Sequence, residues 1–198
     1  KPKGVLICHS NVARLFSATD HWFHFDRSDV WPLFHSYAFD LSVWEIWGAL
    51  LHGGRVVVVP HLVSRSPEDF YRLLVDEKVT MLCQTPSAFK QLQFYEDSLP
   101  REEWEQLALR CVVFGGERLS FPGLASWFER HGDAHPEIIN MYGITETTIH
   151  TTYRRVSQHE AVDGSPSYIG VPIPDQPCYV LDADRKPVAV GEEGELYV

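Results

Sequence analysis

The highest concentration of chemically useful side chains lies in residues 140–148, where an amide, a phenol, hydroxyls and a carboxylate surround one glycine. Asn140, Tyr142, Thr145 and Glu146 supply one group of each kind. An aromatic ring can stack on a base, hydroxyls can donate to phosphate oxygens, and a carboxylate is a hard ligand for Mg²⁺. An apolar pair precedes the segment, so we expect it to follow a buried strand, where open α/β sheets bind ligands. The segment indicates a magnesium-nucleotide site, with a plain structural turn as the alternative.

Composition and charge limit the function classes. The chain has 198 residues, 44% hydrophobic and 22% charged, which is an ordinary globular composition. Its formal net charge of −10 and its lack of any Lys/Arg run argue against a nucleic-acid surface. A nucleotide site needs only local donors and stays possible. No apolar run is long enough to span a membrane, and we expect a cytoplasmic protein.

The four cysteines, Cys8, Cys83, Cys111 and Cys178, are far apart and form no C-x-x-C pair. The first three lie at the ends of apolar runs, as small buried residues do. We interpret them as reduced core residues of a cytosolic protein, and not as disulfides or zinc ligands.

Short apolar runs alternate with amphipathic segments along the first part of the chain. Buried strands are predicted at residues 5–8, 30–34, 55–59, 79–83, 111–114 and 138–141. A capping box of Ser42 and Glu45 predicts one helix, and Ser66 with Pro67 predicts the start of another. Further helices are predicted at residues 86–94 and 122–129. The repeated strand–helix–strand units favour a doubly wound, largely parallel α/β sheet with helices on both faces.

The pattern changes after about residue 151, where helical periodicity fades. Strand-like runs at residues 179–181 and 195–198 are separated by turns rich in Pro and Gly. We therefore expect an α/β core in residues 1–150 and the start of a β-rich portion in residues 151–198. Both ends of the sequence are abrupt, so we expect a piece of a longer polypeptide.

Five landmarks occur in order, at residues 1–5, 39–45, 115–117, 140–148 and 194–196. Together they closely resemble the adenylation domains of non-ribosomal peptide synthetases, within the adenylate-forming enzyme superfamily. The resemblance covers essentially the whole chain. It implies that the chain is part of the large N-terminal subdomain of such a domain.

The resemblance also implies a reaction. An amino acid carboxylate would be joined to ATP, with Mg²⁺, to give an aminoacyl adenylate and pyrophosphate. The acyl group would then pass to the phosphopantetheine thiol of a peptidyl carrier protein beside other synthetase domains. Half of the phosphate loop, the ribose-binding aspartate and the C-terminal subdomain with its catalytic lysine are absent from this sequence. We therefore expect this piece alone to be inactive, whether an inserted domain interrupts the parent chain or the record of the chain is partial.

Roles for the nucleotide-site residues follow from the same resemblance. Lys3 would neutralise phosphate charge, Thr145 would donate to a phosphate oxygen and Glu146 would bind Mg²⁺. Glycine backbone would lie against adenine, with an amide at its exocyclic amine and an aromatic ring on its face. The nucleotide-binding set is Gly115, Gly116, Glu117, Asn140, Met141, Tyr142, Gly143 and Thr145.

The amino acid pocket implied by the resemblance consists of Asp40, Leu41, Trp44, Cys83, Val113, Gly115, Met141, Ile149 and His150. Asp40 follows Phe39 and precedes an apolar helix, so we expect it to be partly buried and in need of a partner. In this family the partner is the α-ammonium group of the substrate. The alternative, that Asp40 only caps the helix, is weakened because the Ser42 capping box would already do so.

The pocket residues also indicate which amino acid is accepted. Trp44 and Met141 make the cavity small, and only His150 offers a second charge, which disfavours strongly charged side chains. The set is similar to the threonine-type pattern except at Cys83, where that pattern has an amide. A site without this amide separates hydroxyl from apolar side chains poorly. The prediction is a small β-substituted amino acid, namely threonine, cysteine, 2-aminobutyrate or valine.

Two other functions stay open at this point. One is an acyl- or aryl-CoA ligase of the same superfamily, which Asp40 argues against. The other is a non-catalytic module that binds a partner or a nucleotide. Residues 119–131, with Leu124, Trp127 and Phe128, either form a core helix or offer a docking surface for a small MbtH-like protein.

Overall fold

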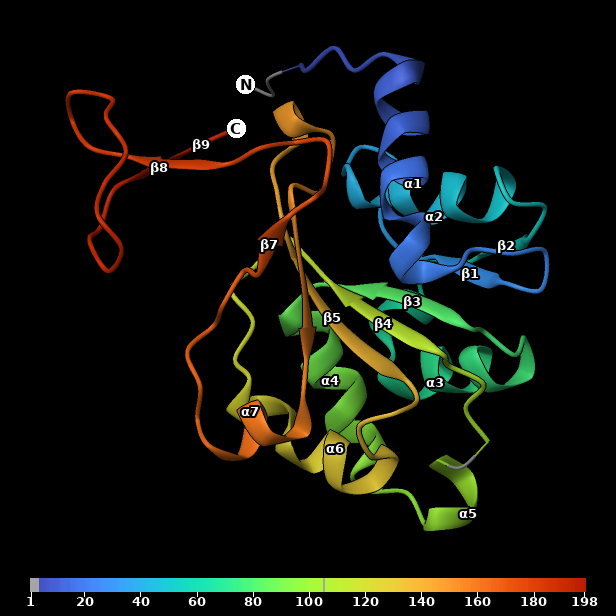
Figure 1. Ribbon diagram of the computed structural model, residues 1–198. Helices are drawn as coiled ribbons and strands as arrows, with labels where there is room; N and C mark the ends of the chain where they lie inside the picture. The colour runs from blue at the N-terminus through green and yellow to red at the C-terminus, as the bar shows by residue number, and fades with distance from the viewer. Residues whose placement is uncertain (1–3, 105) are drawn as a thin grey trace.

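A computed structural model describes residues 4–104 and 106–198, which form three sheets with helices around them (Figure 1). The helices are α1 His9–Phe23, α2 Leu41–Leu50, α3 Pro67–Asp76, α4 Pro86–Glu96, α5 Arg101–Trp104, α6 Ala125–His131 and α7 Gln158–Val162, with short 3₁₀ turns η1 Val63–Arg65, η2 Pro122–Leu124 and η3 Thr145–Thr147. The strands are β1 Val30–Leu33, β2 Arg55–Val58, β3 Met81–Gln84, β4 Cys111–Phe114, β5 Glu137–Tyr142, β6 Thr152–Val156, β7 Val171–Pro172, β8 Tyr179–Leu181 and β9 Glu195–Tyr197.

The central sheet has the order β3-β4-β5-β6-β7. Its first three strands are parallel, and β6 and β7 join the edge antiparallel. Strands β1 and β2 form a separate parallel pair connected by α2. This pair continues the sheet, since the backbone N–H of Thr80, just before β3, donates to the carbonyl of Val30 at 3.0 Å. The parallel strands therefore end at one common edge.

Both faces of the sheet are covered. Leu82, Val112 and Ile138 point into one apolar core, which contains residues of α3, α4 and α6. Their neighbours in the strands point into a second core, shared with α1 and α2 (Figure 1). All four residues of β3 and all four of β4 are buried, which explains why these runs are continuously apolar. The predicted α/β sheet with helices on both faces is confirmed.

The predicted strand at residues 5–8 is wrong. This segment lies outside the strands, and Leu6 is fully exposed. Cys8 is exposed as well, while Cys83 and Cys111 are buried as predicted, and all four thiols are free. The segment leads into α1, a helix that the sequence reading missed because its buried side chains are few and interrupted by polar residues.

Strand β2 is present but is not buried as predicted. Among the described residues it pairs only with β1, and Val58 is 70% exposed. An edge strand of this kind carries the same β-branched residues as a central strand, so its apolar run does not reveal its position.

The two predicted helix starts have different outcomes. Ser66 accepts a hydrogen bond from Asp69 N at 3.2 Å, with Pro67 in the first turn, as predicted. The capping box at Ser42 is wrong, because α2 already begins at Leu41 and Ser42 is buried. The Glu45 carboxylate turns instead towards the segment after β1.

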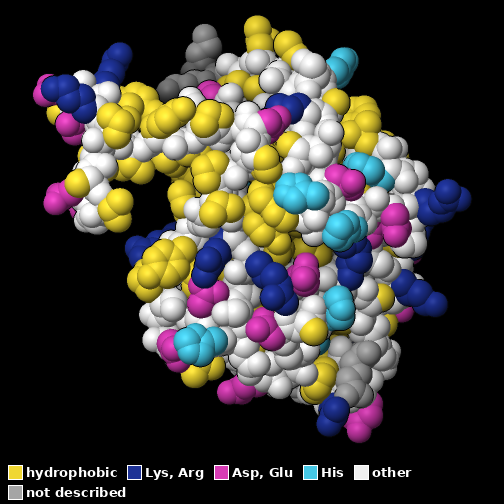
Figure 2. All heavy atoms as spheres, viewed as in Figure 1, with side chains coloured by type: hydrophobic (Ala, Val, Ile, Leu, Met, Phe, Trp, Pro, Cys, Tyr) yellow, Lys and Arg dark blue, Asp and Glu magenta, His cyan; other side chains and the backbone are white. Residues whose placement is uncertain are grey.

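The last residues form an antiparallel pair, β8 and β9, on an arm that projects from the sheet (Figure 1). Hydrophobic side chains gather along this arm (Figure 2), and Tyr179 and Val190 are among its exposed residues. The preceding strands β6 and β7 belong to the central sheet. The division of the chain near residue 150 stays a prediction. Among the described residues, none of the helices combines the length and apolarity needed to cross a membrane.

Candidate active site

The predicted site residues converge on the carboxyl edge of the parallel strands. Cys83 lies near the end of β3, Gly115 follows β4, Tyr142 ends β5, and Asp40 directly precedes α2. Parallel strands deliver their ends to the same edge, and this is where open α/β sheets bind ligands.

Asp40 is half-buried and contacts the segment of residues 140–148. Its Oδ2 accepts a hydrogen bond from the Thr145 hydroxyl at 2.7 Å, across 105 residues of sequence. The carboxylate makes no capping hydrogen bond to α2, although Asp40 occupies the N-cap position. The alternative that Asp40 only caps α2 is therefore wrong. The reason is the missing hydrogen bond from its own side chain, and not a capping box at Ser42.

His150 is the most unusual side chain of the site. It is 1% exposed, and neither ring nitrogen has a hydrogen-bond partner in the described parts of the chain. Burial lowers the pKa of this imidazole to about 3, so it is neutral at physiological pH. Its ring meets Trp44 edge-on, with centroids 4.9 Å apart, and the buried indole Nε1 of Trp44 also lacks a described partner. These two adjacent side chains therefore hold three buried nitrogens that lack a partner among the described residues.

Gly115 lies beside this pair. A Cβ atom added there would be 3.4 Å from His150 Cε1 and 3.4 Å from Leu41 Cδ2. The apolar members of the predicted pocket share one buried cluster, which includes Leu41, Trp44, Cys83, Val113, Met141 and Ile149. The predicted pocket residues, all of which the structure describes, therefore carry no charge apart from that of Asp40.

A strained turn holds one wall of the site. Thr148 and Ile149 have φ values of 67° and 71°, in the left-handed region that β-branched residues avoid. The turn is fixed by the hydrogen bond from Thr151 N to Tyr142 O at 2.7 Å, and a Cβ added at Gly143 would lie 2.2 Å from Ile149 O. Gly143 is therefore needed for close backbone approach. Thr148 was not among the predicted site residues, because no local sequence pattern predicts its conformation.

A cavity of about 470 Å³ adjoins the pocket on the side of β5. Its lining includes Gly116, Glu117, Asn140, Met141, Tyr142 and Gly143, all from the predicted nucleotide set, together with Arg118, Leu119, Ile144, Ser167 and Ile169, which the sequence argument did not select. Asn140 Nδ2 donates to the Tyr168 carbonyl at 2.8 Å, which orients the amide. Its Oδ1 is then the atom free to accept from a ligand.

Two members of the nucleotide set have structural duties as well. Glu117 accepts hydrogen bonds from Ser87 N at 3.0 Å and Ser87 Oγ at 2.8 Å, in the first turn of α4. Gly116 has φ +81°, and a Cβ there would lie 3.3 Å from the ring of Phe39. These contacts hold the loop after β4 against its neighbours.

Glu146 is exposed on the 3₁₀ turn η3 at the rim of the site. The described residues contain no group of three or more His, Cys, Asp or Glu side chains that could enclose a metal. One accessible carboxylate nevertheless fits Mg²⁺, which is commonly held by one or two carboxylates plus substrate phosphates and water. Lys3 lies outside the described residues.

A larger cavity of about 640 Å³ lies on the other side of β3, between α3 and α4. None of the predicted site residues that the structure describes lines it. Gln84 does, and its buried Nε2 has no partner within the described residues. The size of this cavity alone gives it no chemical assignment.

Comparison with known proteins identifies the family. The profile described as "AMP-binding enzyme" matches residues 1–198. The chain is 57% identical over 197 residues to "Dimodular nonribosomal peptide synthase" of Bacillus subtilis (strain 168), and 49% identical over 198 residues to "Syringomycin synthase SyrB1" of Pseudomonas syringae pv. syringae. These matches cover 100% of the chain but only 8% and 32% of those two proteins.

Solved structures agree with these sequence matches. The Vibrio cholerae adenylation domain AlmE, in complex with glycyl-adenosine-5'-phosphate, aligns over 99% of the chain and 36% of its own, with a TM-score of 0.82 and 26% identity. The peptide synthetase FmoA3 in its AMPPNP-bound form also gives a TM-score of 0.82 and 26% identity, covering 94% of this chain and 20% of that one. The chain therefore belongs to the AMP-binding enzyme family and is part of the core of an adenylation domain of the non-ribosomal peptide synthetase type.

Proposed function

We propose that the full-length protein activates a small amino acid as its aminoacyl adenylate, using ATP and Mg²⁺. The proposal depends above all on the Asp40 carboxylate, which is half-buried, accepts a hydrogen bond from Thr145 and directly precedes Leu41 and Trp44 of the buried, uncharged cluster that contains the predicted pocket residues. A carboxylate in this position can bind the α-ammonium group of a substrate. The ligands named for the two similar structures, glycyl-adenosine-5'-phosphate and AMPPNP, support the same chemistry.

The nucleotide would occupy the cavity beside β5. Asn140 Oδ1 would accept from the exocyclic amine of adenine, and the half-exposed ring of Tyr142 would lie on its face. The Thr145 hydroxyl, which now bonds Asp40, would turn to a phosphate oxygen while Asp40 bonds the substrate ammonium group. Glu146 would hold Mg²⁺, which offsets phosphate charge.

In the reaction, a substrate carboxylate oxygen forms a bond to the α-phosphorus of ATP, and the bond to the leaving pyrophosphate breaks. Asp40 orients the amino acid, and Lys3 would neutralise charge on the pyrophosphate. We further propose transfer of the acyl group to the phosphopantetheine thiol of a carrier protein in the cytoplasm.

The pocket favours threonine or cysteine within the set that also includes 2-aminobutyrate and valine. His150 is neutral, so it offers no charge to an acidic or basic substrate. Its unpartnered nitrogens and the Trp44 Nε1 would instead be satisfied by a hydroxyl or thiol on the substrate β-carbon. Cys83, fully buried at the end of the pocket, supplies little hydrogen bonding to this group.

The segment considered for an MbtH-like partner does not offer the expected surface. Leu124, Trp127 and Phe128 are 3%, 0% and 1% exposed, so they belong to the core. The alternative of a core helix is confirmed for these side chains.

Amino-acid-dependent exchange of pyrophosphate into ATP by the full-length protein tests the proposal. We expect threonine or cysteine to give the highest rate, and Asp40→Ala to lower kcat/KM by about 100-fold, because a buried charge pair is lost. Glu146→Gln should abolish most of the exchange. Glu193→Gln, at an exposed acid on the distal arm, is the matched control and should have no effect.

The rival functions give different results. A CoA ligase would retain activity in Asp40→Ala and would accept acids without an amino group. A non-catalytic module would show no amino-acid-dependent exchange in the unaltered protein. A preference for an aromatic or charged amino acid would refute the proposed substrate class.

A further inference from the structure

A fully buried carboxylate, that of Glu45, lies in α2 five residues after Asp40. Glu45 is 0% exposed, and burial raises its pKa while hydrogen bonds from the segment after β1 oppose that rise. Its Oε1 pairs with His35 Nδ1 at 2.7 Å, and its Oε2 accepts from Phe34 N and His35 N, each at 3.1 Å. The carboxylate is fully used within the protein and has no place in the reaction described above.

These bonds anchor the start of the loop that carries Asp40. The loop begins after Leu33, the last residue of β1, and ends where α2 begins at Leu41. Because Glu45 lies in α2, its bonds to Phe34 and His35 connect the first residues of the loop to the helix that follows the loop. Inside the loop, Phe39 N donates to Ser36 O at 2.8 Å. The loop is therefore held at its entry by Glu45 and at its exit by α2.

The pair also fixes the aromatic residue beside Asp40. The rings of His35 and Phe39 meet at an angle of 67°, with centroids 5.4 Å apart. The Phe39 ring in turn fills the space that a Cβ at Gly116 would need, at 3.3 Å. A continuous set of contacts therefore runs from Glu45 through His35 and Phe39 to the loop after β4.

We propose that the His35–Glu45 pair positions Asp40 and thereby sets the selectivity of the site for substrates with an α-ammonium group. This inference rests on the proposed function. His35 and Glu45 act through Asp40 and are positioning residues. Displacement of a binding group by about 1 Å can cost about 100-fold in rate, so a loose loop would be detected in kinetics.

The test compares two substrates of the full-length protein. One is the preferred amino acid, and the other is its des-amino analogue, which has hydrogen in place of the ammonium group. In Glu45→Gln we expect kcat/KM for the amino acid to fall about 10- to 100-fold, with KM for ATP and kcat/KM for the analogue unchanged. His35→Leu leaves the two backbone hydrogen bonds to Glu45 intact and should give a smaller change of the same kind.

A matched control is available in the second buried His–Glu pair. His131 Nε2 lies 2.9 Å from Oε1 of Glu96, which is 0% exposed, and this pair connects α6 to α4 within the other core. His131→Leu should lower the thermal midpoint of unfolding without changing the ratio between the two substrates. The same ratio change in this control would overturn the inference.

The remaining outcomes are also decisive. Equal losses for the amino acid and the analogue in both variants would show a general structural role and overturn the inference. If Glu45→Gln does not fold, the ratio measured in His35→Leu decides. An unaltered protein without amino-acid-dependent exchange would refute the proposed function itself, whereas an active protein with unchanged ratios in the variants would refute the inference alone.

Discussion

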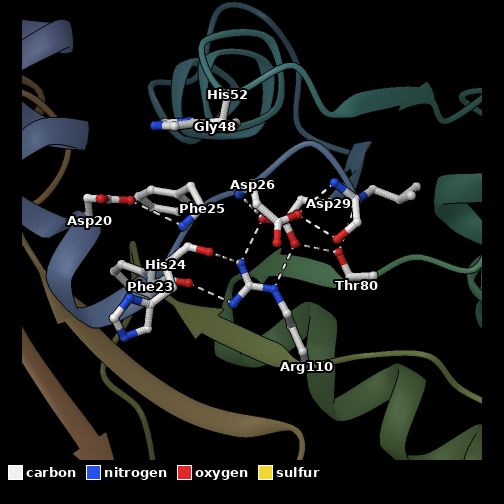
Figure 3. A network of polar contacts seen from close by, with 12 residues as sticks. Asp20, Phe23, His24, Phe25, Asp26, Asp29, Gly48, His52, Thr80 and Arg110 are labelled. Atoms are coloured by element: carbon white, nitrogen blue, oxygen red, sulfur yellow. Dashed lines mark hydrogen bonds and ion pairs between the residues drawn. The ribbon is translucent and has the colours of Figure 1, made fainter.

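The two ends of the parallel strands differ in how far the buried polar groups there are hydrogen-bonded. At the amino ends, the 1% exposed Asp29 accepts from Thr80 Oγ1 at 3.0 Å, from Arg110 Nε and Nη2 at 2.7 Å each, and from Asp26 N at 3.1 Å (Figure 3). Arg110 also donates to the Phe23 carbonyl at 2.7 Å. At the carboxyl ends, by contrast, His150, Trp44 and Gln84 keep buried nitrogens without partners among the described residues.

We propose that this difference separates polar groups that stabilise the fold from polar groups that a ligand would satisfy. An unpartnered buried polar atom costs stability, and a bound molecule can recover that cost by pairing with it. The amino-end network joins α1, β1, β3 and β4, whereas His150 and Trp44 belong to the proposed amino acid pocket and Gln84 lines the larger cavity beside β3. Stability and function should therefore respond differently to substitutions at the two ends.

Breaking the amino-end network should have the largest effect. Arg110→Met leaves the Asp29 carboxylate buried without its cation, so we expect the free energy of unfolding to fall by about 3 kcal/mol. Urea titration measures this, and pyrophosphate exchange at a temperature where the variant is folded should be unchanged. Arg72→Met, in an exposed pair with Glu68, is the control and should cost less than about 1 kcal/mol. Equal losses in the two variants would contradict the comparison.

At the carboxyl end, the corresponding change affects catalysis. Gly143→Ala would place a methyl group against the Ile149 carbonyl and push the strained turn out of the site. We expect kcat/KM to fall by about 100-fold or more, because the turn positions Ile149 and His150. Gly123→Ala, where the added carbon would be 3.5 Å from the Ser120 side chain, should be nearly neutral. An active Gly143→Ala variant would show that the turn is not part of the site.

The pH dependence of stability should also distinguish the two ends. Burial lowers the pKa of His150 to about 3, while a histidine in the unfolded chain titrates near about 6.5. Below about pH 6.5, His150 therefore binds a proton in the unfolded chain but stays neutral in the folded chain, so acid favours unfolding. Between about pH 8 and about pH 5 this difference lowers the free energy of unfolding by about 2 kcal/mol. The His150→Leu variant lacks the imidazole, so we expect its free energy of unfolding to be without this decrease. A gap between the two proteins that stays constant with pH would mean that the imidazole has a partner.

Much of the fold could be predicted, because the segments with strong local patterns are buried or capped in the folded chain as those patterns indicate. The buried runs of β4 and β5 and the Ser66 cap with Pro67 are of this kind. The edge position of β2 and the exposed residues before α1 could not be predicted, because both depend on which neighbours cover the segment. The antiparallel pairing of β6 and β7 with the central sheet could not be predicted either, because it depends on which strands pair and not on the composition of the two segments.

The candidate site shows the same division. The resemblance in the sequence selected residues that the structure brings together, including Asp40, Thr145 and His150. It could not reveal that Asp40 and Thr145 bond each other, because that contact spans 105 residues. Glu45 was assigned to a cap on local spacing, whereas the fold offered it the three donors of Phe34 and His35.

The smallest effect expected is also the one that most directly joins stability to function. His150→Leu removes a buried polar ring without breaking a described hydrogen bond, so at about pH 8 we expect the free energy of unfolding to rise by about 1 kcal/mol. The same variant should lose most of its preference for threonine or cysteine over valine in pyrophosphate exchange, because only Trp44 Nε1 would remain to bond the β-substituent. Thr80→Val, at the amino end, leaves Val30 N and Asp29 short of a partner and should lower stability by about 1 kcal/mol with selectivity unchanged. The changes in the free energy of unfolding should therefore have opposite signs in the two variants. The Thr80 hydroxyl is satisfied within the fold, whereas the His150 ring would be satisfied only by the substrate. A destabilised His150→Leu protein would place His150 among the groups that hold the fold.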